Sequence, residues 1–263
     1  MQSTISKNEI DLVIPGIEID MYKWVEHIPE IKEVGALALL NNRELIQLCK
    51  DKWLFYNSIN EIGVPCVIES TLSNDYNYLE RKFGTPFLLK PRHGFGSKGI
   101  VYVDDEDIFT KHQLEIGHNL MVQPIVGNDN EEYTVSAFGD GKGGGYTSIA
   151  LKRKLSKDGF TEKAEVVLAV EFDETILQLC RQFQPIGPTN YQFRKCNEGL
   201  KLLEINPRIS SSTSIRAAFG YNESAMAVSY YLENKIPVQP TIRMGRAARY
   251  MDEHIFYENS IHI

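Results

Sequence analysis

The chain has 263 residues, of which 43% are hydrophobic, and this length suggests one large domain or two closely packed lobes. Its net charge is −7 and its longest basic run is only Lys152-Arg153-Lys154, so a nucleic-acid partner is not expected. No signal peptide is visible and no apolar run approaches the ~18 residues of a membrane span, so no membrane contact is expected either. The four cysteines are widely spaced without zinc-ligand spacing, and this usage predicts a reducing, cytoplasmic setting.

The first half of the chain predicts short strands and helices in alternation. Strands are expected over residues 11–16, 35–40 and 64–69, and helices over 21–28, 51–62 and 75–83. The opening segment is expected to be the end of an N-terminal α/β unit rather than a complete domain.

The second half is richer in strands. Strands are expected over 120–127, 132–140, 145–152 and 163–170, with a helix over 175–183 capped by Asp173. A last helix is expected over 224–233, capped by Asn222, with Ala225, Val228, Tyr231 and Leu232 on its buried side. Clustered elements with antiparallel hairpins predict α+β lobes rather than one doubly wound sheet.

A glycine-rich loop lies between two expected strands, over residues 90–100 (KPRHGFGSKGI). No helix follows it, so it fits neither a dinucleotide fingerprint nor a Walker loop. A loop of this kind can act as a flap, because glycines let backbone amides close over phosphates. The alternative interpretation is the flexible tip of a hairpin.

A second hairpin is predicted around the turn Asn197-Glu198-Gly199. If the hairpin is symmetric about Glu198, Gln192 lies directly opposite Glu204. Side chains alternate along a strand, so Tyr191, Phe193, Leu203 and Ile205 are expected in the core, and Gln192, Glu204, Asn206 and Arg208 on the other face. Amide and carboxylate oxygens suit Mg²⁺, and a guanidinium suits a phosphate, although a solvated polar face is the plainer interpretation.

The segments KPRHGFGSKGI and GPTNYQ…LLEINPR, in this order, resemble the ATP-grasp superfamily, most closely the ATP-grasp domains of the carbamoyl-phosphate synthase large chain. The resemblance covers about residues 42–235. It implies an ATP-grasp fold in which two α+β lobes clasp a nucleotide. Its expected parts are a remnant of the N-terminal α/β domain (1–45), a small lobe with the flap (46–122) and a large lobe with the metal site (123–263).

The resemblance also implies roles for individual residues. Lys52 and Lys90 match the cations that neutralise the nucleotide phosphates, and Glu132 matches the carboxylate that binds the ribose, with its neighbour Glu131 left open. Arg208 matches the group facing the transferred phosphoryl, and it is expected to be catalytic together with Lys90. The other matches are the flap residues Gly94, Gly96, Ser97 and Gly99, the adenine-binding hinge at Gln123 and Ile125, and the magnesium ligands Gln192, Glu204 and Asn206.

The run Lys152-Arg153-Lys154 matches a region that often supplies another cation to the anionic site. By alternation Arg153 points opposite to its two neighbours, so the sequence leaves open which of the three faces the site. A solvated basic turn is the plainer alternative.

The implied cofactors are ATP and Mg²⁺, with one or two ions and with Mn²⁺ able to substitute. The implied activity is a ligase that joins a carboxylate to an amine, thiol or similar acceptor through an acylphosphate, with small molecules as substrates. The short N-terminal segment motivates a second hypothesis. In it the chain is a non-catalytic ATP-binding module completed by a partner subunit or by copies of itself.

Overall fold

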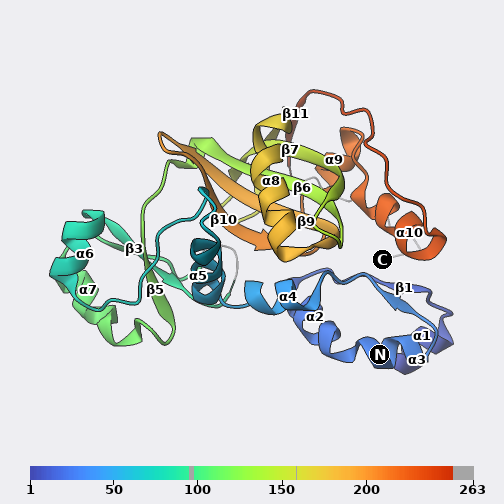
Figure 1. Cartoon of the computed structure of the whole chain (residues 1–263), viewed down its shortest axis with the longest axis horizontal. Helices are drawn as coiled ribbons and strands as arrows, with labels where there is room; N and C mark the ends of the chain where they lie inside the picture. The colour runs from blue at the N-terminus through green and yellow to red at the C-terminus, as the bar shows by residue number, and fades with distance from the viewer. Residues whose placement is uncertain (95–97, 158, 251–263) are drawn as a thin grey trace, which may run out of the picture.

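The computed structural model describes residues 1–94, 98–157 and 159–250. The chain forms an N-terminal segment, a small lobe and a large lobe, and helix α5 lies between the two lobes (Figure 1). None of the helices within the described residues combines the length and apolar character that a membrane crossing requires.

The N-terminal segment is a helical layer with two short parallel strands, which pair Leu12 with Leu37. Its core joins α2 to α4, because Met21 and Val25 pack with Leu40 and Ile46. In chain order its elements are α1 (Gln2–Lys7), β1 (Leu12–Val13), α2 (Glu18–Trp24), η1 (Val25–His27), α3 (Ile28–Glu33), β2 (Leu37–Ala38) and α4 (Arg43–Cys49).

Helix α5 (Lys52–Ile62) starts and ends on local signals that the sequence carries. The Asp51 side chain accepts from the amide of Trp53, and Gly63 closes the helix in the left-handed region at φ 69°. The strand expected over residues 64–69 is wrong. These residues are not a strand, and bonds from the Leu202 amide to the Cys66 carbonyl (2.7 Å) and from Lys201 Nζ to the Val67 carbonyl (3.4 Å) tie them to the large lobe.

The small lobe is a three-stranded antiparallel sheet in the order β4-β3-β5, packed against two helices. Its core contains Leu79, Phe87, Phe109 and Val122. The elements are α6 (Tyr76–Phe83), β3 (Phe87–Pro91), β4 (Val101–Val103), α7 (Glu106–His112), η2 (Gln113–Glu115) and β5 (Leu120–Pro124).

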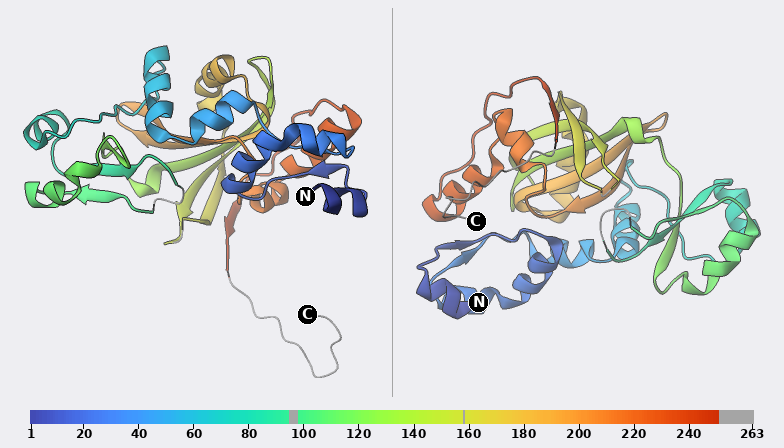
Figure 2. Two further views of the ribbon diagram at one scale, coloured as in Figure 1. Left: turned by 90° about the horizontal axis from the view of Figure 1, so that it is seen from below. Right: turned by 180° about the vertical axis from the view of Figure 1, so that it is seen from behind.

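The large lobe is a six-stranded antiparallel sheet in the order β10-β9-β6-β7-β8-β11. Helix α8 covers one face, and α9 and α10 lie on the other side (Figures 1 and 2). The elements are η3 (Asp129–Glu131), β6 (Glu132–Asp140), β7 (Gly145–Leu155), β8 (Thr161–Val167), α8 (Val170–Phe183), β9 (Ile186–Cys196), β10 (Gly199–Asn206), α9 (Thr213–Ala218), α10 (Glu223–Glu233) and β11 (Arg246–Ala248).

Two helix predictions in this lobe need correction. Helix α8 starts five residues earlier than expected, at Val170, so Asp173 lies within its first turn and does not cap it. Helix α10 has the expected Asn222 cap, but Glu223 and Ala227 are its buried residues. The Glu223 carboxylate forms an ion pair with Arg216 in the interior, and this contact turns the Glu223 side of α10 toward the core.

Candidate active site

The hairpin of β9 and β10 brings the three expected metal ligands together. Gln192 and Glu204 are direct partners across the hairpin, as the sequence predicted. The Gln192 Nε2 atom donates to Glu204 Oε1 at 2.7 Å, and Asn206 Nδ2 donates to the same oxygen at 2.9 Å. One carboxylate and two side-chain amides therefore converge on one point of the sheet face.

An irregularity in β10, and not simple alternation of side chains, produces this register. The hairpin starts with Gly199 opposite Cys196, and an irregularity between Leu202 and Glu204 shifts the pairing by one residue. The expectation that Leu203 is a core residue is therefore wrong: Leu202 is fully buried and Leu203 only half-buried. The bulge places Glu204 on the polar face while Leu202 and Ile205 both reach the core.

Arg153 is the member of the basic run that reaches this site. Its Nη2 atom donates to Gln192 Oε1 at 2.5 Å and to Glu132 Oε1 at 2.9 Å. Burial lowers the pKa of the Arg153 guanidinium, while Glu132 acts in the opposite direction. Lys152 instead pairs with Glu131, and Lys154 is exposed.

The same contacts separate Glu132 from Glu131. Glu132 is 4% exposed, and its two carboxylate oxygens accept from Arg153 and, at 3.1 Å, from Arg194. Glu131 bonds Lys152 and Tyr133, away from Gln192. Of the two neighbours, Glu132 is the one that belongs to the cluster containing Gln192.

Lys90 reaches the cluster from β3 of the small lobe. Its ammonium lies 3.3 Å from the Tyr56 hydroxyl and 5.2 Å from the centre of the Tyr56 ring. Tyr56 in turn donates to the carbonyl of Leu203, beside Glu204. Burial lowers the pKa of Lys90, and the negative charge of Glu204 partly offsets this effect.

Lys52 links helix α5 to the start of the flap. Its Nζ atom donates to the carbonyl of Gly94 at 2.5 Å. Burial lowers its pKa, whereas Glu204 and Glu18 raise it, so its ammonium lies in the same field of charges. Gly94 and Gly99 have φ of 106° and 77°, values that favour glycine, while Gly96 and Ser97 lie outside the described residues.

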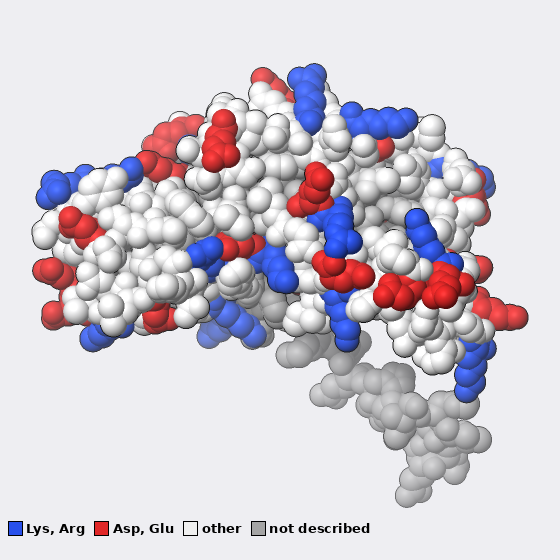
Figure 3. Space-filling view, turned by 60° about the horizontal axis from the view of Figure 1, so that its bottom comes forward, with Lys and Arg blue, Asp and Glu red and all other residues white. Residues whose placement is uncertain are grey.

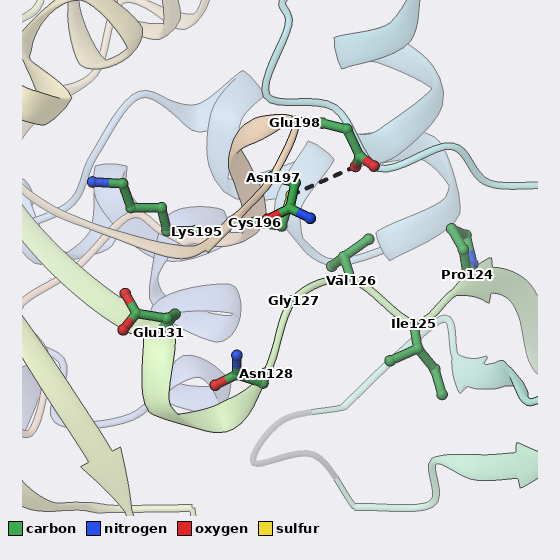
Figure 4. A pocket seen from close by; sticks show the side chains of 10 residues that line it. All are labelled: Pro124, Ile125, Val126, Gly127, Asn128, Glu131, Lys195, Cys196, Asn197 and Glu198. Carbon is green, nitrogen blue, oxygen red and sulfur yellow. Dashed lines mark hydrogen bonds between the residues drawn. The ribbon is translucent and has the colours of Figure 1, made fainter.

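The hinge residues line a hollow of about 630 Å³ between Pro124–Asn128 and the β9–β10 turn (Figure 4). Ile125 is 38% exposed at this hollow, whereas the Gln123 side chain is buried and bonds Ser70 at 2.8 Å. Lys90 and Glu204 are not among the lining residues. The hollow therefore adjoins the hinge end of the site and not the metal-ligand end.

Arg208 follows β10 and forms an ion pair that the sequence did not predict. Its Nη2 atom donates to Glu18 at the start of α2, and its Nη1 atom donates to the Ile209 carbonyl at 2.8 Å. The two paired side chains are only 14% and 13% exposed. No local signal could have revealed this contact, because Glu18 and Arg208 lie 190 residues apart.

The side chains of Gln192, Glu204 and Asn206 suit a hard cation whose remaining ligands are phosphate oxygens. Within the described residues no three His, Cys, Asp or Glu side chains form a metal-binding group. Glu204 is instead the one carboxylate, and the amides of Gln192 and Asn206 touch the same oxygen. Mg²⁺ accepts such a set, because it needs few protein ligands when nucleotide oxygens and water complete its shell.

Comparisons with known proteins agree with this geometry. A family model described as ATP-grasp in the biosynthetic pathway with Ter operon matches residues 117–253, just over half of the chain. The chain belongs to this ATP-grasp family. The other comparisons concern more distant ATP-grasp relatives.

Among curated proteins, the carbamoyl phosphate synthase large chain of Thermotoga sp. (strain RQ2) is 24% identical over 213 residues, which cover 74% of this chain. That of Thermotoga neapolitana is 23% identical over 224 residues and 78% of the chain. The ATP-grasp chain spans only 19% and 20% of the length of these two relatives.

Solved structures show the same fold. A biotin carboxylase from Campylobacter jejuni, in complex with an ATP analogue, superposes with a TM-score of 0.74 at 16% identity, over 93% of this chain and 59% of that one. An N5-carboxyaminoimidazole synthetase from Staphylococcus aureus, complexed with ADP, gives 0.72 at 17% identity, over 92% and 66%. At these identities the likeness establishes the ATP-grasp fold.

Proposed function

We propose that the chain is an ATP- and Mg²⁺-dependent ligase, which activates a carboxylate as an acylphosphate and joins it to an amine or thiol. One observation carries the proposal. The side-chain amides of Gln192 and Asn206 converge on one oxygen of Glu204, Arg153 donates to Gln192 Oε1, and the charge of Glu204 acts on Lys90. A nucleoside triphosphate with its bound metal ion requires this combination of cationic and anionic side chains.

The roles of the residues follow from their positions. Lys90 and Lys52 would neutralise the phosphates, and Glu132 would bind the ribose while Arg153 and Arg194 hold its carboxylate. Gln192, Glu204 and Asn206 would hold Mg²⁺. When bound, the ion supplies charge neutralisation between the β- and γ-phosphates, and one or two ions, or Mn²⁺, fit the same donors.

The chemistry then needs position and charge more than covalent work by the protein. A carboxylate oxygen of the substrate attacks the γ-phosphorus, and ADP leaves as the acylphosphate forms. Arg208 faces the transferred phosphoryl group and stabilises its charge. The acceptor nitrogen or sulfur then attacks the acyl carbon, and inorganic phosphate leaves with the electron pair of the broken C–O bond.

The test measures ADP release with Mg²⁺, ATP and a set of carboxylates that includes bicarbonate, with hydroxylamine added to trap the acylphosphate. We expect one carboxylate to give ADP and a hydroxamate in equal amounts. A Glu174→Gln variant, altered at an exposed position of α8, is the control that keeps activity. ADP release with none of the carboxylates contradicts the proposal.

The second hypothesis, a non-catalytic ATP-binding module, rests on a feature of the N-terminal segment. Its two strands form an isolated parallel pair, and Ile14, Ile17 and Ile19 beside them are 39–59% exposed. Parallel sheets are normally covered on both faces, so this surface suits a partner subunit or a second copy. Tight Mg-ATP binding without turnover, together with turnover on adding a partner, favours this hypothesis.

A further inference from the structure

The Glu18–Arg208 ion pair places a carboxylate of the N-terminal segment directly on a proposed catalytic cation. Glu18 is the first residue of α2, and Met21 of the same helix packs against Ile46 of α4 in a buried cluster. In η1, which follows α2, Glu26 bonds Arg43 and accepts from Gln47 at 2.6 Å. The carboxylate is therefore held at Arg208 by packing and not by chance contact of two mobile side chains.

The charge of the Glu18 carboxylate also affects the pKa values of Tyr22 and Lys52. Burial raises the pKa of Tyr22, one turn along α2, and the charges of Cys49, Glu18 and Glu204 raise it further. Glu18 also acts on the pKa of Lys52. The first two turns of α2 thus face the end of the site where Glu204 and Arg208 lie.

This pair conflicts with the proposed role of Arg208. The Nη2 atom of the guanidinium donates to Glu18, and Nη1 donates to the Ile209 carbonyl. Its Nε atom is buried and has no hydrogen-bond partner. A phosphoryl group or carboxylate that takes a bidentate bond from the two Nη groups therefore competes with Glu18 for Nη2. When it succeeds, a carboxylate that is 13% exposed loses its counterion, which is strongly unfavourable unless another cation replaces it.

Lys52 does not supply that replacement. Its ammonium donates to the Gly94 carbonyl at 2.5 Å and lies on the flap side, where phosphates need it. The counterion must then come from outside the protein, at the moment when the anion takes Arg208.

We propose that Glu18 binds the acceptor substrate, and that this acceptor is a cationic amine whose ammonium replaces Arg208 as the partner of the carboxylate. The proposal rests on the proposed ligase function and selects a C–N over a C–S product. A thiolate would meet the negative charge of Glu18, whereas an ammonium is attracted to it and passes one proton to the Glu18 carboxylate, so that the neutral nitrogen attacks the acyl carbon as phosphate leaves. Anion and amine binding are consequently coupled through the exchange of one ion pair.

The experiment uses the full chain loaded with MgADP and needs no knowledge of the true substrates. Isothermal titration calorimetry measures the affinity for inorganic phosphate, the probe for the Arg208 subsite. Methylammonium is the amine probe, and tetramethylammonium is its control because it has the charge but no N–H donors. The variants are Glu18→Gln and Asp20→Asn, which removes a charge from the same helix without touching Arg208.

In the wild type, methylammonium should tighten phosphate binding about fivefold or more, a typical coupling between two linked sites, and tetramethylammonium should not. In Glu18→Gln, phosphate should bind more tightly than in the wild type without any amine, and methylammonium should have no effect. Asp20→Asn should behave as the wild type. If Glu18→Gln does not fold, as judged by thermal unfolding, Glu18→Asp should show the same two changes in weaker form.

Two results overturn the proposal: no effect of methylammonium on the wild type, or weaker phosphate binding in Glu18→Gln, which would make Glu18 only a support for Arg208. Failure of the wild type to bind MgADP overturns the ligase function together with this proposal. Normal MgADP binding without the amine effect overturns only the role of Glu18.

Discussion

Two polar clusters lie on the same face of the six-stranded sheet, and they differ in how completely their groups are sealed from solvent. In the inner cluster, Arg216 and Glu223 are 0% and 1% exposed, and their ion pair is 2.9 Å long. Arg216 also bonds Thr134 and Asn190, and Ser136 bonds Glu223. The sheet, α9 and α10 enclose this cluster on every side.

The outer cluster is one or two residues along the same strands. Thr134 faces Gln192 in register, so the two clusters are contiguous. Here the amides of Gln192 and Asn206 converge on one oxygen of Glu204; the Asn206 amide can reverse to offer its oxygen to an ion, whereas Gln192 Oε1 accepts from Arg153. The comparison teaches that one polar sheet face serves structure where its groups are sealed from solvent, and is available for the proposed binding where Gln192 and Glu204 stay partly exposed.

The charged surface gives no such distinction. Figure 3 shows basic and acidic side chains interspersed over the face that it presents, without a continuous field of one sign. The difference between the clusters therefore depends on burial and hydrogen-bond geometry, not on net charge.

The largest expected effect comes from breaking the inner cluster. Arg216→Met should lower the free energy of unfolding by about 3–5 kcal/mol, because it leaves the buried Glu223 carboxylate without a counterion. Equilibrium urea denaturation measures this loss. The double variant Arg216→Met/Glu223→Leu should recover much of it, and a single variant as stable as the wild type would show that the cluster is not structural.

The next effect comes from the outer cluster, where the expected loss is in activity and not in folding. Glu204→Ala should lower Mg²⁺-dependent ADP release on the order of 10²-fold or more, as for other groups that stabilise developing charge. Its melting temperature should stay close to that of the wild type, because no buried ion pair is broken. Full activity in Glu204→Ala would remove the carboxylate from the metal site; Glu174→Ala at an exposed position of α8 is the matched control.

The smallest effect concerns the two lysines that join the outer cluster, whose pKa values burial lowers. A lowered pKa means that some Lys52 and Lys90 side chains are neutral at an alkaline pH where an ordinary lysine, with a pKa of about 10.4, is still charged. Triphosphate favours the charged form and raises the pKa again, so binding should take up a fraction of a proton at alkaline pH and less as the pH falls.

Calorimetry of a non-hydrolysable ATP analogue in two buffers of different ionisation enthalpy measures this uptake. The variant Lys90→Met should reduce it, while Lys154→Met, which changes an exposed lysine, should not. Proton release on binding at alkaline pH would contradict the environment described for Lys90.

Much of the fold was readable from local patterns. Strand β6 has the predicted bounds, the Asp51 cap starts α5, and alternation correctly separated Arg153 from its neighbours. These features are local because a cap needs two or three residues, and the face of a side chain needs only the period of its strand. The opposition of Gln192 and Glu204 was also predicted, although the bulge at Leu203 provides it.

The sequence alone thus predicted which residue types could carry the chemistry, and it determined the ATP-grasp fold. Only the tertiary structure decided that Glu18 pairs with Arg208, that Glu132 and not Glu131 joins Arg153, and that the inner cluster closes around Arg216. The physical reason is that an ion pair depends on distance in space. No periodicity of the chain encodes a contact between side chains 190 residues apart.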